Sequence, residues 1–268
     1  MFGPRVAIAS LSGRSDAAWA EAAAEHVGAA FLGGIALDER SRRAARELVA
    51  RDREEFLPDD PLAFVDAELR ALDDVPIRAA FNVRSATVEP VREAAEICAD
   101  RDAVLEINAH CRQDELCAAG CGEALLADAD RLCEYVAAAS GAGATVSVKA
   151  RAEVDGVDLP ETARRIDAAG ADAIHVDAMD SESTISDVAA AADLFVIANN
   201  EVRDRASVRE YLGYGADAVS VGRPSDESAV LRRVRRAVDE WFEGGGDAGE
   251  RGAGTAADAS ASTPEPQS

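Results

Sequence analysis

The sequence predicts an α/β fold, a single (β/α)8 TIM barrel followed by a disordered C-terminal tail. Eight short runs of apolar and β-branched residues alternate with Ala-, Arg- and Glu-rich stretches over about 240 residues, as eight strand–helix units require. The length of 268 residues suits one such barrel, although two small domains would also fit. A glycine able to close the preceding helix stands just before several strands, in Gly28-Ala-Ala, Gly143-Ala-Thr, Gly170-Ala-Asp-Ala and Gly215-Ala-Asp-Ala. This recurrence favours stacked strand–helix units over two unlike domains.

The elements follow in chain order. Runs of apolar and β-branched residues predict strands at 6–10, 29–35, 76–83, 103–109, 145–150, 173–177, 194–199 and 218–222. The stretches between them predict helices, among them 16–27, 40–56, 88–99, 128–139, 159–169, 185–192, 205–212 and 227–242. An open doubly wound sheet is the alternative, but no G-x-G-x-x-G motif follows the first strand. We therefore expect the barrel to occupy residues 1–243.

The segment 244–268 differs in composition from the rest. It consists mainly of Gly, Ala, Asp, Ser, Thr and Pro, and we expect it to be disordered because it has little to bury against the entropy of ordering. No run approaches about 18 consecutive apolar residues, so we expect no membrane span. No basic start precedes an apolar core, so we expect no signal peptide.

The chain is strongly acidic. Its 51 Asp and Glu against 28 Lys and Arg give a formal net charge of −23, which argues against a basic nucleic-acid-binding surface. Lys149 is the only lysine, and the other basic residues are arginines. An acidic, lysine-poor surface is typical of a halophilic protein, because salt screens its self-repulsion. The net charge therefore says more about the solvent than about a partner.

Five cysteines, an odd number, stand in a chain without a secretory signal, which indicates free thiols and a cytoplasmic location. Cys98 and Cys133 fall on predicted helices, where a cysteine usually serves as a small apolar residue. The spacing Cys111-x5-Cys117-x3-Cys121 contains no C-x2-C pair, so it only weakly indicates zinc or an iron–sulfur cluster. We expect no metal site.

In a barrel of this kind the active site lies at the carboxyl ends of the strands. Lys149 ends the fifth strand, and a chain with arginine at every other basic position has kept a compact ammonium there. Arg151 lies two residues on and shares its face. Two converging cations predict an anionic ligand or a developing negative charge. The alternative is an accidental lysine whose ammonium merely reaches solvent.

Other strand ends also deliver polar residues. Cys111 follows Asn108 and His110, and a thiol with a pKa of about 8.5 can donate a proton at neutral pH, although a small buried cysteine is equally common. His175 and Asp177 share a face of strand six, and we interpret His175 as a satisfied core histidine.

The ends of strands seven and eight lie where many barrels bind phosphate through backbone N–H groups. They read Asn199-Asn200-Glu201 and Gly222-Arg223. Arg223 can pair with a phosphate or equally with a neighbouring carboxylate.

Together these segments resemble the tRNA-dihydrouridine synthases, FMN-binding TIM barrels related to the dihydroorotate dehydrogenases. The similarity extends from Leu105 to Arg223, and its order and spacing are more specific than any single motif. Residues 106–111 are similar to that family's E-I-N-x-G-C-P, 120–126 to G-A-G-x-A-L-L, 148–151 to V-K-x-R, 196–199 to the start of V-I-A-N-G-D, and 215–223 to G-A-D-x-V-M-I-G-R.

The resemblance implies an FMN cofactor, with NAD(P)H as the expected electron donor. It implies cofactor binding by Lys149 and by the loops after the later strands, at Asp177, Asn199, Asn200, Gly222 and Arg223. Reduced flavin would pass hydride to C6 of a uracil ring, in tRNA or in a free pyrimidine, and Cys111 would protonate C5. Lys149 would stabilise the enolate charge, while Asn108 and Arg151 would bind the substrate.

Several positions depart from the family pattern. His110 and Arg112 replace the glycine and proline that flank the cysteine, and Asp177 replaces a histidine that helps bind the flavin phosphate. A carboxylate facing phosphate lowers affinity unless a cation offsets it. The helical RNA-binding domain that usually follows the barrel has no counterpart after Phe242, so RNA binding is left open. The alternatives are a dihydroorotate-dehydrogenase-like enzyme acting on a free small molecule and a non-catalytic flavin- or nucleotide-binding barrel.

Overall fold

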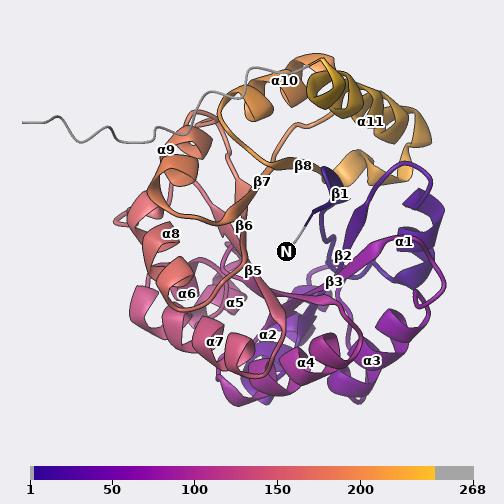
Figure 1. The fold of residues 1–268 in the computed structure, drawn as a ribbon. Coiled ribbons are helices and arrows are strands. Elements are labelled where there is room, and N and C mark those ends of the chain that lie inside the picture. The colour runs from indigo at the N-terminus through magenta and orange to yellow at the C-terminus, as the bar shows by residue number, and fades with distance from the viewer. Residues whose placement is uncertain (1–2, 245–268) are drawn as a thin grey trace, which may run out of the picture.

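A computed structural model describes residues 3–244, and the tail from 245 to 268 lies outside the described residues. Eight parallel strands close into a barrel in the order β1 to β8, which confirms the predicted fold class. Figure 1 shows the helices surrounding the strands. The strands are β1 (Val6–Ile8), β2 (Ala29–Ala36), β3 (Arg78–Arg84), β4 (Val104–Asn108), β5 (Thr145–Arg151), β6 (Ala173–Asp177), β7 (Phe195–Asn199) and β8 (Ala218–Val221).

The longer helices form the outer ring. They are α1 (Ala17–Ala23), α2 (Glu39–Val49), α3 (Pro61–Arg70), α4 (Glu89–Asp100), α7 (Ala129–Gly141), α8 (Leu159–Ala168), α9 (Thr184–Ala191), α10 (Arg205–Gly213) and α11 (Ser228–Glu243). Shorter helices follow β4 and β8, namely α5 (Asp114–Ala118), α6 (Glu123–Leu126) and the 3-10 helix η1 (Arg223–Asp226). None of the helices within residues 3–244 has the length and apolar character needed to cross a lipid bilayer.

Part of the acidic composition is used at helix N-termini. An aspartate side chain accepts a backbone N–H in the first turn at Asp16, Asp38, Asp60, Asp128, Asp158 and Asp204. Each carboxylate satisfies an N–H that has no partner within its helix and interacts favourably with the helix dipole. These acids therefore have local structural roles in addition to keeping the surface charged.

Two of the predicted helix bounds are wrong. The helix expected at 40–56 ends at Val49, because Asp52 has a φ of 60° that a helix cannot accommodate. The loop that follows reaches the barrel mouth and ends at α3, a helix absent from the prediction, which Asp60 caps and Pro61 begins. The helix expected at 16–27 ends earlier, at Ala23.

The barrel interior has an apolar layer and a polar layer. The apolar layer is a small cluster separate from the main core, which packs between strands and helices (Ala7, Ala29, Phe31, Ala80, Val104, Ile197 and Ala218). Nearer the carboxyl ends of the strands the buried side chains are polar (Asn82, Glu106, Asn108, Lys149, His175 and Ser220). The register pairs Asn108 with Lys149 and Lys149 with His175, so these side chains share one layer.

Candidate functional site

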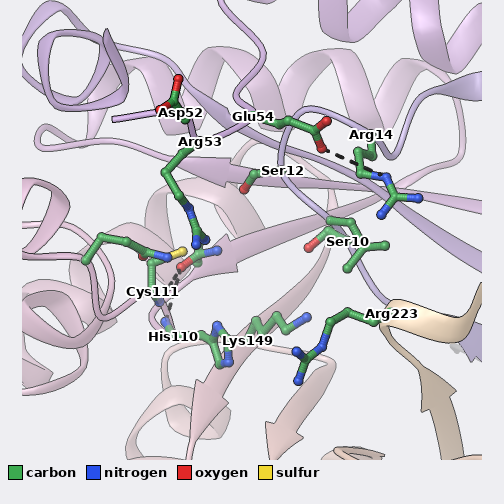
Figure 2. A pocket seen from close by; sticks show the side chains of 13 residues that line it. Ser10, Ser12, Arg14, Asp52, Arg53, Glu54, His110, Cys111, Lys149 and Arg223 are labelled. Carbon is green, nitrogen blue, oxygen red and sulfur yellow. Dashed lines mark hydrogen bonds and ion pairs between the residues drawn. The ribbon is translucent and has the colours of Figure 1, made fainter. Parts of the chain in front are cut away.

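A cavity of about 450 Å³ opens at the carboxyl ends of the strands. Its lining comes from the loops after β1, β4 and β8, the end of β5 and the loop after α2 (Ser10, Leu11, Ser12, Arg14, Asp52, Arg53, Glu54, Asn108, His110, Cys111, Gln113, Lys149 and Arg223). In Figure 2 Lys149 lies between His110 and Arg223. We call Asn108, His110 and Cys111 the thiol wall, and Lys149 and Arg223 the cation wall.

Lys149 is buried without a polar partner. The residue is 4% exposed, it lines the cavity, and its ammonium forms no hydrogen bond or ion pair with any residue in 3–244. A buried charge without a partner costs free energy, and a ligand that brings electronegative atoms to it offsets that cost. This burial differs from that of a lysine whose ammonium merely reaches solvent, because such a residue would be exposed.

Below the cavity a chain of buried hydrogen bonds crosses the barrel from β8 to β4. The Ser220 hydroxyl lies 2.7 Å from Nε2 of His175, and Nδ1 of His175 lies 2.7 Å from Oε2 of Glu106. Asn82 Nδ2 donates to Glu106 Oε1 at 2.7 Å, and Asn108 Nδ2 donates to Asn82 Oδ1 at 2.9 Å. His175 is fully buried with both ring nitrogens bonded, as the core-histidine interpretation predicted.

Glu106 is the charged group in this series of hydrogen bonds. Burial would raise the pKa of its carboxyl, but the charge and hydrogen bond of His175, the charge of Lys149 and the Asn82 amide together hold it below the ordinary value. Burial lowers the pKa of His175, and the charge of Lys149 lowers it further. Glu106 is therefore a carboxylate that balances the charge of Lys149 without bonding to it.

The hydrogen-bonded chain ends on the backbone of the thiol wall. Asn108 Oδ1 accepts the N–H groups of His110 at 3.2 Å and of Cys111 at 3.0 Å. From the other side Gly122 packs so closely, at a φ of 60°, that a Cβ atom would lie 2.0 Å from the Cys111 carbonyl oxygen. The Cys111 backbone is thus held between Asn108 and a position where only glycine fits.

His110 pairs with Asp177 across the end of β5. Nε2 of His110 lies 2.6 Å from Oδ2 of Asp177. Burial lowers the pKa of His110, but the hydrogen bonds with Asp177 and Cys111 outweigh it and leave the pKa above the ordinary value. Burial likewise raises the pKa of Asp177, and the bond to His110 brings it below the ordinary value. The charge of Asp177 is therefore compensated by His110. Asp177 itself does not line the cavity.

Cys111 differs from the other four cysteines. Burial would raise the pKa of its thiol, but the hydrogen bond with His110 and the positive charge of Arg84 lower it below the ordinary value. Burial raises the pKa of Cys98 and Cys121 to about 12, and it also raises that of Cys117 and Cys133. All five are free cysteines, and no three metal-binding side chains are grouped within residues 3–244.

A buried ion pair supports the thiol wall from β3. Arg84 at the end of β3 pairs with Glu55, and both side chains are almost completely buried. Arg84 also donates to the Gly34 carbonyl, and its charge reaches Cys111. Neither Arg84 nor Glu55 was among the predicted site residues. Arg84 could have been found, because it too is a polar residue at the carboxyl end of a strand.

Arg151 lies outside the cavity lining. Its guanidinium pairs with Glu123 at 2.5 Å and donates to the Met179 sulfur at 3.1 Å. The side chain is 8% exposed, so the ion pair is well shielded from water. Arg151 therefore connects β5 to α6 and to the loop after β6.

The loops after β7 and β8 bring only Arg223 to the cavity lining. Asn199 Nδ2 donates to the Ser220 carbonyl at 3.0 Å, which ties β7 to β8. Asn200 has a φ of 104°, and its Nδ2 donates to the Met179 carbonyl at 2.7 Å. The loop thus keeps the backbone shape of a glycine at Asn200, held by side-chain hydrogen bonds. Arg223 is exposed and has no ion-pair partner within residues 3–244, and Gly222 is not among the lining residues.

Comparison with known proteins places this geometry in a family. Residues 72–240 match the family model described as Dihydrouridine synthase (Dus). The chain belongs to the dihydrouridine synthase family. The match includes every strand end that carries the thiol and cation walls, from β4 to β8, and it confirms the resemblance found in the sequence. Membership of the dihydrouridine synthase family also places the chain among flavin oxidoreductase-like barrels.

Other similarities are more distant. An uncharacterized protein of Methanocaldococcus jannaschii is 22% identical over 250 residues, which cover 89% of this chain and 92% of that protein. Dihydroorotate dehydrogenase of Eimeria tenella, solved in complex with ferulenol, has a TM-score of 0.64 at 14% identity and covers 90% of this chain and 82% of that one. Thiamine phosphate pyrophosphorylase of Pyrococcus furiosus has a TM-score of 0.53 at 10% identity, covering 88% and 96%. The two structural matches show the shared barrel fold.

Proposed function

We propose that this dihydrouridine synthase family member is an FMN-dependent oxidoreductase that reduces a uracil ring, with Cys111 as the proton donor. The observation that carries the proposal is that the unpartnered ammonium of Lys149 and the thiol of Cys111 line the same cavity. Ring reduction requires two groups of this kind from the protein. One is a cation that can stabilise the negative charge on the ring, and the other is an acid that can release a proton.

The residues present fit an FMN group. Lys149 offers an unpaired donor inside the cavity, and Arg223 offers a free guanidinium at its edge, where a phosphate can bind it in a bidentate manner. Asp177 stands where the family has a phosphate-binding histidine, but His110 compensates its charge, so it does not repel an anion strongly. We propose that Asp177, Asn199, Asn200 and Gly222 shape this part of the site through the backbone.

The chain's own residues have separate tasks in this reaction. A bound FMN would supply the hydride, and NAD(P)H would restore it. Lys149 would stabilise the negative charge that develops on the ring when hydride reaches C6. Cys111 would hold the proton that C5 receives at its Sγ atom, because Asn108 and Gly122 fix its backbone at the cavity wall. Asn108 retains one Nδ2 hydrogen with which it can bind the substrate base, and Arg151 would hold the Glu123 side of the site.

Two candidate substrates follow from the proposed reaction. The family of the chain makes a uracil ring in tRNA the first substrate to test. A chain with a formal net charge of −23 repels the phosphates of RNA where salt does not screen it, which makes a free pyrimidine, as in a dihydroorotate-dehydrogenase-like reaction, the second. Either reaction uses free thiols, which suits a reducing cytoplasm.

Titration of the purified protein with FMN tests the proposal. We expect one equivalent of FMN to bind, with a shifted visible spectrum and altered flavin fluorescence. Riboflavin lacks the phosphate and serves as the matched ligand, which we expect to bind more weakly because Arg223 then has no anion to pair with. A protein that carries no flavin and gains none from excess FMN would contradict the proposal.

The substrate is tested by mass spectrometry of tRNA from a strain that lacks the protein. Loss of a dihydrouridine from that tRNA, restored by the wild-type chain and not by Cys111→Ala, would support tRNA as the substrate. An unchanged dihydrouridine content, together with flavin-dependent NAD(P)H consumption on a free pyrimidine, would support the second candidate.

A further inference from the structure

The pair of His110 and Asp177 carries a role that the proposed function leaves open. The family motifs that this chain resembles have glycine and histidine at these two positions, so the pair is a feature of this chain. His110 follows β4 and Asp177 ends β6, with β5 between them. Asp177 Oδ2 lies 2.6 Å from His110 Nε2, and Asp177 Oδ1 accepts the Met179 N–H at 3.3 Å. Both oxygens are engaged, so the carboxylate is fixed in orientation.

His110 also precedes the thiol directly in sequence. It lowers the pKa of Cys111, and because its Nε2 faces Asp177, the ring nitrogen available to the sulfur is Nδ1. Neighbouring side chains in an extended segment point apart, but Asn108 Oδ1 accepts both backbone N–H groups and folds this segment into a turn. Both side chains line the cavity, where Figure 2 shows them next to each other. Asp177, His110 and Cys111 thus form a continuous line that ends in the cavity.

The charges around this line come from several elements. Arg84 of β3 and Glu55 of the loop before α3 act on the thiol, and Lys149 of β5 acts on the imidazole. Two further thiols and four rim residues complete the surroundings (Cys117, Cys121, Arg14, Asp52, Arg53 and Glu54). Of all these groups only His110 has an imidazole, the side chain whose ordinary pKa lies nearest neutral pH.

We propose that Asp177, His110 and Cys111 form a proton relay, in which the His110 imidazolium returns a proton to the Cys111 sulfur after the thiol has protonated the substrate. The S–H bond breaks as a C–H bond forms on the substrate carbon. The Nδ1–H bond of His110 then breaks as the S–H bond forms again, and the neutral imidazole takes a proton from cavity water. One proton enters for each proton delivered, and no group is oxidised or reduced. Asp177 is a positioning residue, since it orients the ring and stabilises its protonated form.

The relay rests on the proposed function, because it assumes that Cys111 delivers a proton. The relay gives a physical reason why this chain has both His110 and Asp177 where the family motifs have glycine and histidine. A histidine at position 110 can refill the thiol only if it holds a proton at neutral pH, and the Asp177 carboxylate favours that form. The relay also predicts that Cys111 alone among the cysteines is readily converted to a thiolate, a property that can be measured without flavin or substrate.

Alkylation of the flavin-free protein by iodoacetamide tests the relay. Trypsin releases residues 102–112 as a peptide whose only cysteine is Cys111, so mass spectrometry reads this thiol separately from the other four. We expect the alkylation of wild-type Cys111 to show a pH midpoint below the ordinary thiol value of about 8.5. In Asp177→Asn and in His110→Gln the midpoint should rise. A rise of about one pH unit in the midpoint lowers the thiolate fraction of Cys111 at neutral pH, and hence its alkylation rate, about tenfold.

Asp180→Asn is the matched control. Asp180 is an exposed acid three residues beyond Asp177, so its removal changes the net charge equally without touching His110. The pH dependence of Cys111 alkylation in Asp180→Asn should equal that of the wild type. If Asp177→Asn does not fold, His110→Gln carries the same test. A wild-type midpoint at or above the ordinary thiol value of about 8.5 would by itself overturn the relay.

The two proposals fail separately. A wild-type profile in both variants would overturn the relay while leaving FMN binding intact. Absence of FMN binding would overturn the oxidoreductase while the alkylation profile could still show the line from Asp177 to Cys111. In the flavin-loaded enzyme the relay predicts that Asp177→Asn lowers kcat and leaves KM unchanged. The loss should be greatest between the His110 pKa of the variant and that of the wild type, where only the wild-type imidazole holds a proton.

Discussion

The two walls of the cavity differ in whether their polar side chains have partners within the protein. The thiol wall is fastened to the barrel by buried hydrogen bonds that run from Asn108 through Asn82, Glu106 and His175 to Ser220. On the cation wall, Lys149 and Arg223 have no ion-pair partner in the described part of the chain. Side chains whose hydrogen bonds are satisfied internally hold a shape, whereas charges left unsatisfied at a cavity await a ligand. Under the proposed function, the contrast separates residues that position other groups from residues that bind the cofactor.

Cutting the hydrogen-bonded chain should have the largest effect on stability. Glu106→Ala leaves His175 Nδ1 and Asn82 Nδ2 without partners and Lys149 without a balancing charge, so the free energy of unfolding should fall by about 3–5 kcal/mol. Urea unfolding followed by circular dichroism measures this change. Glu240→Ala, which removes an exposed ion pair with Arg205, is the control and should leave the midpoint unchanged. Equal midpoints for the two variants would show that the buried chain does not stabilise the barrel.

A methyl group at Gly122 should press on the thiol wall from the outside. Gly122→Ala places a Cβ atom against the Cys111 carbonyl at a φ that disfavours alanine, and the backbone strain alone should cost about 1–3 kcal/mol. Because the Cys111 backbone must move, its rate of alkylation should change as well. Gly141→Ala has open space around the new methyl group and should keep or slightly raise the stability. A Gly122→Ala protein with unchanged stability and Cys111 reactivity would contradict this account of the wall.

Asp38 should produce a smaller, pH-dependent effect. It caps α2 and accepts the Ala86 N–H at 2.6 Å. Burial would raise its pKa, but these hydrogen bonds and those from Ser41 and Ser85 hold it below the ordinary value of 3.8. Its stabilising contribution is therefore complete above pH 3.8 and is lost as the pH falls through the lower folded-state pKa.

Asp38→Ala should thus be less stable than the wild type by about 1–2 kcal/mol at pH 7. The difference should shrink as the pH falls below 3.8. Unfolding curves recorded between neutral and acidic pH measure it, and a difference that grows on acidification would contradict the assignment.

The sequence predicted the barrel well because its signals are local. Each strand is a short apolar run, and all eight formed near their predicted ranges. The loop after α2 was missed because Ala-, Arg- and Glu-rich residues continue past Val49, and only the left-handed conformation at Asp52 ends the helix. Helix α3 was missed although Asp60 and Pro61 form an ordinary helix start.

The site was predictable where strand ends alone decide it. Asn108, Cys111, Lys149 and Arg223 meet at one cavity because parallel strands bring their carboxyl ends together. The pairing of His110 with Asp177 was not predictable, because it joins residues 67 apart in sequence through a turn that Asn108 shapes. The sequence shows that both positions depart from the family, and the structure shows that the two side chains compensate each other.

The binding of FMN to Lys149→Met tests the central claim most directly. Methionine keeps much of the length of the side chain, and Glu106 keeps its hydrogen bonds with His175 and Asn82, so the fold should persist, with an unfolding midpoint lowered by the loss of the charge that balances Glu106. Loss of a hydrogen bond to a charged group should weaken FMN binding about 10- to 100-fold, whereas Arg203→Met, which removes an exposed cation paired with Glu201, should bind FMN like the wild type. Equal affinity of wild type and Lys149→Met for FMN would contradict the claim that the cation wall is the flavin site.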